Sequence, residues 1–151
     1  MRAAVQRVKT ASVIINNNNY SSINQGLLVL LGISVNDKDP DLDYIIDKII
    51  NLRIFTDDNG KMNNDITSIQ GEFLIVSQFT LYGDARKGRR PSFIEAEKGE
   101  KAENIYNIFI EKLKNQYSSE KVKNGKFGAK MEVSLINNGP VTILLDSEKK
   151  F

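Results

Sequence analysis

Short apolar stretches separated by polar turns occur along most of the chain. Residues 1–15 are rich in Val, Ile and Thr with partial alternation, which predicts one long bent strand or two short ones. The run of four Asn at 16–19 predicts a turn or loop insertion. Gly26–Gly32 is apolar at every position between its two glycines, a pattern typical of a central strand buried on both faces.

Two stretches have helical spacing instead. Asp39-Pro40-Asp41 offers a side-chain acceptor for first-turn amides, a proline at the first helical position and acids that the helix dipole favours. This first helix is predicted to end at about Leu52, with an apolar stripe formed by Leu42, Ile45, Ile46, Ile49 and Ile50. A second helical pattern starts near Ser92 and strengthens from Lys101. Its apolar stripe consists of Ala102, Ile105, Phe109 and Leu113.

The remaining apolar stretches predict strands. Phe73–Tyr82 is one, and a polar basic loop follows it. Met131–Leu135 and Val141–Leu145 are two more, so the C-terminal third is predicted to be antiparallel β. Asn137–Thr142, between them, has the composition of a hairpin turn. Two helices against a mainly antiparallel sheet indicate a mixed α/β fold, and the 151 residues, without repeat or linker, suit a single domain spanning 1–151.

Composition excludes several kinds of chemistry. The chain has no His and no Cys, so a Ser-His-Asp triad, a thiolate nucleophile and a His- or Cys-ligated metal are all excluded. The acidic residues are dispersed, so neither a metal nor a cofactor is expected. No signal peptide is recognisable, and the longest aliphatic run, Leu27–Leu31, is far shorter than the ~20 residues of a membrane helix. A cytoplasmic protein without a membrane segment is the expectation.

Charge is nearly balanced, with 21 Lys and Arg against 19 Asp and Glu. A net charge of +2 is too small for bulk attraction to nucleic acid, so any such contact requires a local patch. Arg86–Pro91 supplies one, with four cations in five positions. A loop facing phosphates and a solvated charged loop both fit it.

Two further segments could carry chemistry. Ser77–Tyr82 gathers hydroxyl and amide side chains at the end of an apolar strand, but composition alone favours a strand whose polar residues simply face water. Asn137–Thr142 contains a Gly-Pro bond, yet a plain turn accounts for it too. Each segment alone is weak evidence.

Together, and in this order, these segments resemble the D-aminoacyl-tRNA deacylase family, in which a Ser-Gln-Phe-Thr motif and an Asn-x-Gly-Pro-x-Thr motif mark the active site. The resemblance covers nearly the whole chain. Further matching stretches are Val5–Val8, Gly26–Gly32, Arg53–Phe55, Gly60–Asn63, Arg90–Phe93 and Met131–Leu135. The departures are Asn138 where an acid is common, Tyr82-Gly83 in place of smaller residues, and the Asn run.

The resemblance implies a barrel-like core of mainly antiparallel sheet with two main helices. It also implies a homodimer with active sites at the subunit interface, which hydrolyses the ester of D-aminoacyl-tRNA to free D-amino acid and tRNA. Gly139-Pro140 would be a cis dipeptide that enters the partner's pocket and rejects L-amino acids by steric clash. Glycine has no side chain to clash, so glycyl-tRNA would partly escape this filter.

Roles for single residues follow from the same resemblance. Ser77 and Gln78 would hold the adenosine end or order the pocket, and the backbone amides of Phe79 and Thr80 would stabilise the oxyanion. A covalent Thr80 nucleophile is the alternative, but the motif supplies no base, so attack by water assisted by the ribose 2′-hydroxyl is preferred. The substrate pocket would include Phe127, Met131, Asn137 and Thr142, with plain core packing as an equal explanation for Met131. The tRNA phosphates would meet Lys87, Arg89 and Arg90.

Two other classes of function remain open at this stage. One is a non-catalytic nucleic-acid-binding accessory protein that uses the same fold and basic loop without turnover. The other is a structural dimer with an inert pocket. The presence of both active-site motifs argues against each, because a pure binder needs neither.

Overall fold

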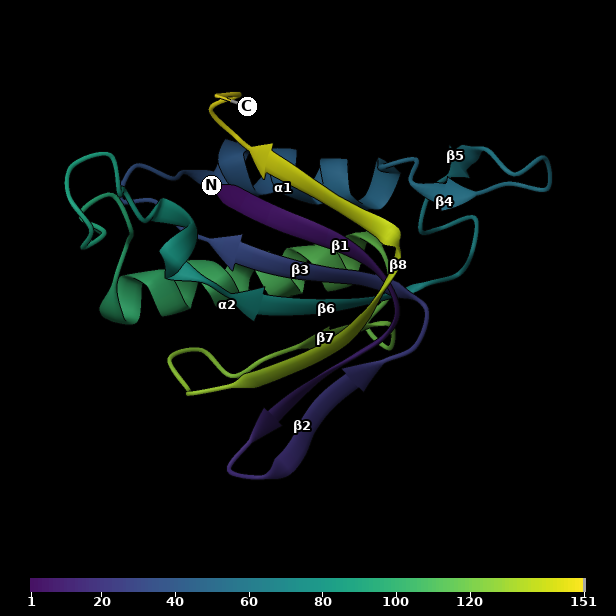
Figure 1. Cartoon of the computed structure of the whole chain (residues 1–151), viewed down its shortest axis with the longest axis horizontal. Helices are drawn as coiled ribbons and strands as arrows, with labels where there is room; N and C mark the ends of the chain where they lie inside the picture. Colours follow the sequence, from purple (N-terminus) through teal and green to yellow (C-terminus); the bar gives the residue numbers. More distant parts are fainter. Residues whose placement is uncertain (151) are drawn as a thin grey trace.

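The alternation of apolar residues produces a strongly curled sheet with two helices packed on one face (Figure 1). The structure is a computed structural model and describes residues 1–150. The strands are β1 (Arg2–Ile15), β2 (Asn18–Ile23), β3 (Gly26–Gly32), β4 (Phe55–Thr56), β5 (Met62–Asn64), β6 (Glu72–Ser77), β7 (Val122–Asn124) and β8 (Glu132–Asp146). The helices are α1 (Asp39–Asn51), α2 (Gly99–Gln116) and the short 3₁₀ helix η1 (Phe79–Tyr82).

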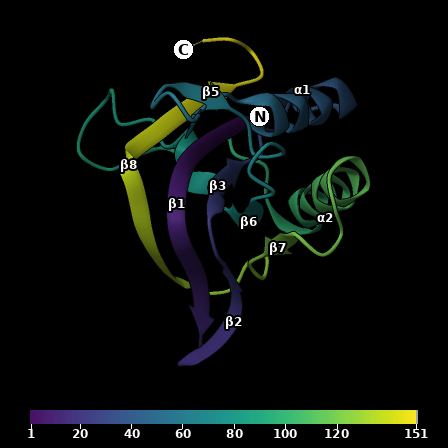
Figure 2. The same cartoon turned by 90° about the vertical axis from the view of Figure 1, so that its right-hand side faces the viewer.

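Strand β1 is the centre of the sheet. Its first half pairs antiparallel with β3, its second half pairs antiparallel with β2, and β8 pairs antiparallel along nearly its whole length. On the other side of β3, the strands β6 and β7 are added in parallel. Figure 2 shows the sheet curling away from the helices, so that β2 and β8 extend beyond the helix-covered part.

The two faces of β3 and β6 contact different apolar clusters. Leu27, Val29 and Leu31 of β3 face the helices together with Phe73 and Ile75 of β6. The alternate positions face a second cluster under the curl of β1, β2 and β8, formed by Val8, Ala11, Val13, Ile23, Leu28, Leu74 and Val76. The prediction that Gly26–Gly32 is a central strand buried on both faces is therefore confirmed.

Both helices form where apolar residues recur at helical spacing, and α1 begins at Asp39 as predicted. At α1 the carboxylate of Asp41, rather than that of Asp39, caps the helix by accepting a 2.9 Å hydrogen bond from the Lys38 amide. Helix α2 begins at Gly99 and not near Ser92. The chain just before it is extended instead, because the Glu97 amide donates to the Ile33 carbonyl at 2.9 Å.

The N-terminal strand is one long element, and the Asn run is not a loop insertion. Only Asn16 and Asn17 form the turn, with φ values of 51° and 62°, while Asn18 and Asn19 already belong to β2. Asn tolerates positive φ better than most residues, which suits it to a tight turn between antiparallel strands.

The C-terminal hairpin prediction is wrong. Residues 132–146 form a single strand, and both halves pair with β1, from Ile14 opposite Glu132 to Arg2 opposite Asp146. The register shifts between Gln6 and Thr10, where β1 faces the Asn-Gly-Pro segment. Because β1 offers hydrogen-bonding partners before and after this segment, the turn-forming residues make a local bulge and do not reverse the chain.

Candidate active site

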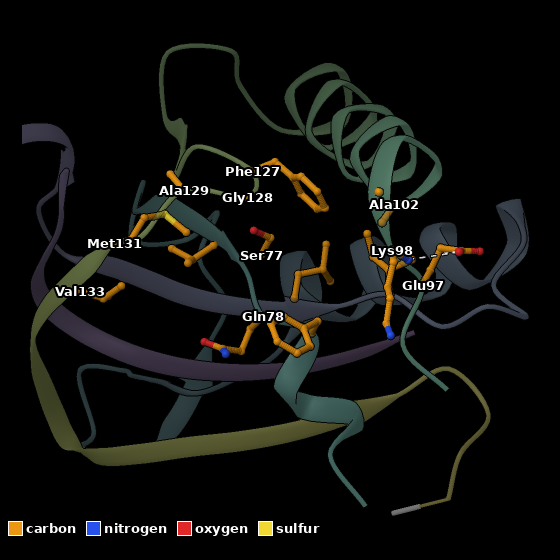
Figure 3. Close-up of a pocket in the computed structure, with 15 residues that line it drawn as sticks. Ser77, Gln78, Glu97, Lys98, Ala102, Phe127, Gly128, Ala129, Met131 and Val133 are labelled. Atoms are coloured by element: carbon orange, nitrogen blue, oxygen red, sulfur yellow. Dashed lines mark hydrogen bonds between the residues drawn. The ribbon is translucent and has the colours of Figure 1, made fainter. Parts of the chain in front are cut away.

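A cavity of about 510 Å³ opens where β3 and β6 end and the N-terminal end of α2 begins (Figure 3). Its walls are mainly apolar, and the polar side chains among them are those of Ser77, Gln78, Glu97 and Lys98. The other lining residues are Leu31, Ile33, Val76, Phe79, Gly99, Ala102, Phe127, Gly128, Ala129, Met131 and Val133. A pocket of this size and composition is typical of a site for a small molecule or for the end of a larger one.

The strand predicted over Phe73–Tyr82 ends at Ser77, so the last part of that prediction is wrong. The Gln78 amide still donates to the Leu31 carbonyl at 2.7 Å, and the chain then turns into η1, where the Leu81 amide donates to the Gln78 carbonyl at 3.3 Å. A side chain at position 32 would press on this turn, since its Cβ would lie 3.1 Å from the Gln78 carbonyl oxygen. Gly32 therefore allows η1 to pack against the end of β3.

This turn leaves two backbone donors unused. The first amides of a helix have no partner inside it. Within residues 1–150, no hydrogen bond uses the Phe79 or the Thr80 amide as donor. Two adjacent free N–H groups beside the cavity are the kind of arrangement that can stabilise an oxyanion.

In the described part of the chain, residues 1–150, no base forms a hydrogen bond with the Thr80 hydroxyl. Its Oγ1 accepts a hydrogen bond from the Gln78 side-chain amide. An amide nitrogen cannot remove a proton, so this contact orients the hydroxyl without activating it. The Phe79 ring, 53% exposed, packs edge-on against Phe93 with 5.1 Å between the ring centroids.

Tyr106 packs against the 127–131 loop, which forms one wall of the cavity. The Tyr106 hydroxyl donates to the Ile75 carbonyl at 2.8 Å, and its ring lies 5.7 Å from that of Phe127. Burial raises the pKa of Tyr106, so its hydroxyl remains a donor at any ordinary pH. Met131 fits against Gly125, where an added Cβ would lie 2.7 Å from the Met131 sulfur.

The cavity wall at the start of α2 is charged, because Glu97 and Lys98 lie directly before the helix. Glu97 forms an ion pair with Lys101 at 2.5 Å and accepts a hydrogen bond from the Lys98 amide at 3.1 Å. These two contacts lower the pKa of the Glu97 carboxyl. Across residues 1–150, no three or more acidic side chains converge as they would to hold a metal ion.

Gly139-Pro140, whose peptide bond is cis, lies away from the cavity of its own chain. Thr142 is level with Gln6 and Leu28, whereas Ser77 is level with Leu31, three residues further along β3. Val133, on the same strand as the Gly-Pro segment, lines the cavity, and Gly139 follows it by six residues, which is roughly 20 Å along β8 at about 3.3 Å per residue.

Three polar side chains hold the Gly-Pro segment. Asn137 Oδ1 accepts from the Val141 amide at 2.7 Å, and its Nδ2 lies 3.2 Å from Thr142 Oγ1. Arg7, only 8% exposed, donates from Nε to the Asn138 carbonyl at 2.7 Å and from Nη1 to the Ile54 carbonyl. Asn137 and Thr142 thus fix the shape of this segment and do not line the cavity of the same chain.

The basic loop contains one paired and three unpaired cations. Arg86 forms two hydrogen bonds of 2.8 Å with the Asp84 carboxylate, which hold the pKa of that carboxyl well below its usual range. Lys87, Arg89 and Arg90 are exposed, and no carboxylate among residues 1–150 pairs with them. The three are therefore available to a polyanion.

Comparison with protein families gives a match over residues 4–146 to the family described as D-Tyr-tRNA(Tyr) deacylase. The chain belongs to this family. Membership of this family confirms the resemblance that the motifs indicated. It also confirms the prediction that the protein is an enzyme of this class.

Curated relatives of the deacylase family match over the full length of both chains. The chain is 58% identical to the D-aminoacyl-tRNA deacylase of Clostridium kluyveri, 56% to that of Clostridioides difficile and 54% to that of Thermosipho melanesiensis, each over 151 residues and 100% of either protein.

Solved structures confirm the fold class. A structure titled "c-Myc DNA Unwinding Element Binding Protein" superposes with a TM-score of 0.93 at 46% identity, covering 97% of this chain and 98% of that one. A probable eukaryotic D-amino acid tRNA deacylase superposes with a TM-score of 0.81 over 95% of this chain and 97% of that one, and at 19% identity it supports the fold alone. No helix within residues 1–150 is long and apolar enough to cross a membrane.

The structure of this deacylase-family chain brings together Ser77, Gln78, Phe79, Phe127 and Met131 around one cavity, with Thr80 directly after them. A second group consists of Asn137, Gly139, Pro140 and Thr142. A third group consists of Lys87, Arg89 and Arg90. Sequence reasoning missed Glu97 and Lys98, because Glu97–Lys101 has the composition of a solvated helix start. It also assigned no role to Arg7, whose burial is not evident from a strand that alternates only in part.

Proposed function

We propose that this protein hydrolyses the ester bond of D-aminoacyl-tRNA, releasing tRNA and the free D-amino acid. The observation that carries the proposal is the pair of free amides, Phe79 and Thr80, at the edge of the cavity in a chain of the deacylase family. The reaction belongs where aminoacyl-tRNA is made and used, so a cytoplasmic location is part of the proposal.

In the proposed reaction the 3′-terminal adenosine enters the cavity between Phe127 and the strand end that carries Ser77 and Gln78. Water adds to the ester carbonyl while the neighbouring ribose 2′-hydroxyl relays its proton. The negative charge that develops on the carbonyl oxygen is stabilised by the Phe79 and Thr80 amides. The bond to the ribose 3′-oxygen then breaks, and that oxygen takes up a proton as the carboxylic acid forms.

Chiral selection is proposed to come from a second copy of the chain. The Gly139-Pro140 segment is exposed and lies well away from the cavity of its own chain, which favours action on a neighbouring subunit. Backbone carbonyls there would bond the substrate ammonium, while an L side chain would collide with the same backbone. Glycyl-tRNA is an additional expected substrate, since glycine has no side chain to reject.

The decisive experiment compares D-tyrosyl-tRNA with L-tyrosyl-tRNA as substrates of the purified full chain. Rapid release of D-tyrosine with slow release of L-tyrosine is expected. Equal rates for the two isomers, or no release above the uncatalysed rate, would contradict the proposal.

The contribution of the second copy is tested with two variants. Gly139→Ala would bring a Cβ within 2.7 Å of the Val141 side chain, so it should disturb the segment and allow L-tyrosyl-tRNA to be hydrolysed. Ala129→Trp should fill the cavity and prevent hydrolysis. In a purified mixed dimer, the open cavity of the Gly139→Ala chain faces the unmodified segment of the Ala129→Trp chain, and rejection of the L isomer should return. A mixed dimer as permissive as Gly139→Ala alone would mean that each chain uses its own segment.

A nucleic-acid-binding role without turnover is the second candidate. It is favoured by the solved structure at 46% identity whose title names DNA binding, together with the unpaired cations of the basic loop. Binding of duplex DNA and of uncharged tRNA should be measured at the same salt concentration. Tight DNA binding together with no deacylation would favour this second role.

A further inference from the structure

Among residues 1–150, Lys98 is the one basic residue that lines the cavity. It lies at the end of the extended segment just before α2, on the wall facing the strand end that carries Ser77 and Gln78 (Figure 3). The residue is exposed, so its ammonium can reach a ligand at the mouth without losing all of its water.

The Lys98 ammonium is not neutralised by its neighbour. Glu97 is the acidic residue of the cavity wall, and its carboxylate is already occupied by Lys101 at 2.5 Å and by the Lys98 backbone amide at 3.1 Å. No ion pair found within residues 1–150 includes the Lys98 side chain. The mouth of the cavity therefore presents a free positive charge.

The chemistry of the substrate indicates what this charge would meet. In an aminoacylated terminal nucleotide the base, the ribose and the ester are neutral, and the amino group is positive. The phosphate on the 5′ side of the ribose is the only anionic group within one nucleotide of the ester. A lysine at the cavity wall gains nothing from the other groups, and it forms a strong charge-assisted hydrogen bond with phosphate.

We propose that Lys98 binds the phosphate on the 5′ side of the terminal adenosine and thereby sets the depth at which the 3′ end enters the cavity. This inference rests on the proposed function, and it assigns Lys98 a positioning role separate from that of the loop cations Lys87, Arg89 and Arg90. Lys101 acts with it, because without Lys101 the Glu97 carboxylate would be free to pair with Lys98.

The test uses two small substrates that differ only in this phosphate, 3′-O-D-tyrosyl-adenosine and its 5′-monophosphate. For the unmodified protein, kcat/KM should be about tenfold higher with the phosphate, the size of one partly exposed charge-assisted hydrogen bond. In Lys98→Gln this preference should fall to about onefold, because kcat/KM decreases on the phosphorylated substrate. Lys98→Arg should retain most of the preference.

Lys130→Gln is the matched control. Lys130 is exposed in the loop between two cavity-lining residues but does not itself line the cavity, so its replacement should leave the phosphate preference unchanged. The proposal is overturned if Lys98→Gln keeps the preference, or if it slows both substrates equally.

Binding separates this inference from the proposed function. Calorimetric titration of the unmodified protein and of Lys98→Gln with adenosine 5′-monophosphate and with adenosine requires no turnover. A preference for the monophosphate that disappears in Lys98→Gln supports the role of Lys98 even if no ester is hydrolysed. Equal affinities of the unmodified protein for adenosine 5′-monophosphate and for adenosine would contradict the proposed role of Lys98.

Discussion

Thr80 contributes two chemically different groups next to the cavity, a hydroxyl and a backbone amide. Within residues 1–150, the hydroxyl accepts a hydrogen bond from the Gln78 side chain and bonds to no base, whereas the amide is a free donor. A mechanism through the hydroxyl needs the side chain, and a mechanism through the amide needs only the N–H. Substitution can therefore tell the two apart.

Thr80→Ala removes the hydroxyl and keeps the amide, so turnover of D-tyrosyl-tRNA should fall by less than about tenfold. Thr80→Pro removes the N–H and should lower kcat by about 10²–10³, the usual effect of removing one oxyanion donor. Single-turnover deacylation measures both rates. A thermal unfolding curve for Thr80→Pro shows whether η1 tolerates the proline, and inactive Thr80→Ala with normal stability would favour the nucleophile instead.

At the scale of elements, β3 and β6 approach closely at the start of their parallel ladder. A Cβ at Gly26 would lie 1.8 Å from the Glu72 carbonyl oxygen, a distance that no side chain can occupy without moving the backbone. The same two strands carry Leu31 and Ser77 to the cavity, so the register set at Gly26 fixes the cavity wall at their other end.

Gly26→Ala should consequently destabilise the fold severely, by more than about 3 kcal/mol, or prevent soluble expression. Gly60→Ala is the control, because position 60 has φ of +78° but no atom within 4 Å of the added Cβ. Backbone strain alone should lower the free energy of unfolding of Gly60→Ala by about 1 kcal/mol. Urea unfolding monitored by circular dichroism gives both values, and similar values for the two variants would show that the close approach is not limiting.

The first turn of α2 gives a pH dependence. The hydrogen bond from Lys101, followed by that from the Lys98 amide, lowers the pKa of Glu97 below its usual 4.5. A lowered carboxyl pKa stabilises the folded state above the unfolded pKa, and this stabilisation disappears as pH falls through the folded pKa. The Tm difference between the unmodified protein and Glu97→Gln should therefore be constant from pH 8 to 6 and shrink below about pH 4.5.

Glu103→Gln serves as the control for this experiment, since Glu103 is an exposed carboxylate on the same helix without an ion pair within residues 1–150. Its Tm difference from the unmodified protein should stay smaller throughout. A Glu97→Gln difference that grows as the pH falls would contradict the assigned direction.

Elements with a strong internal pattern were predictable from the sequence, and elements shaped by distant partners were not. The apolar run in β3 and the helical spacing after Pro40 identify their structures locally. The Asn-Gly-Pro segment has turn chemistry, but its structure is set by pairing with β1, more than a hundred residues away along the chain. Likewise, the end of β6 at Ser77 depends on packing of η1 against Gly32, which no local pattern reveals.

For the site, Ser77 to Thr80 and the Gly-Pro segment could be predicted because their sequence motifs match those of a known family. Glu97 and Lys98 could not be predicted as site residues, because two charged residues before a helix are common on any solvent-exposed surface. Their place at the cavity follows from the pairing of residues 95–97 with residues 33–35, a contact between two irregular segments.

At the scale of the whole molecule, a net charge of +2 leaves long-range attraction weak, so tRNA affinity should depend on the basic loop. Replacing Lys87, Arg89 and Arg90 together with Gln should weaken tRNA binding and flatten its dependence on salt, by about 0.7 to 0.9 in logarithmic slope for each phosphate that the variant no longer neutralises. Hydrolysis of 3′-O-D-tyrosyl-adenosine should not change.

Arg86→Gln is the matched control in the same loop, because its charge is already paired with Asp84. It should change the salt dependence of tRNA binding by less than any one of the three unpaired cations does. Fluorescence anisotropy of labelled tRNA between 50 and 300 mM salt, roughly the range where binding to phosphates dominates, measures the slope. A decrease in activity on the small substrate as well would indicate a folding defect in the triple variant.

Arg7 joins the Asn138 carbonyl beside the Gly-Pro segment to the Ile54 carbonyl at the base of the β4–β5 arm. A single buried guanidinium therefore links the β4–β5 arm directly to the Gly-Pro segment. If that segment acts on a neighbouring subunit, Arg7 would connect a contact made by the β4–β5 arm of one chain to the selection of substrate in the other.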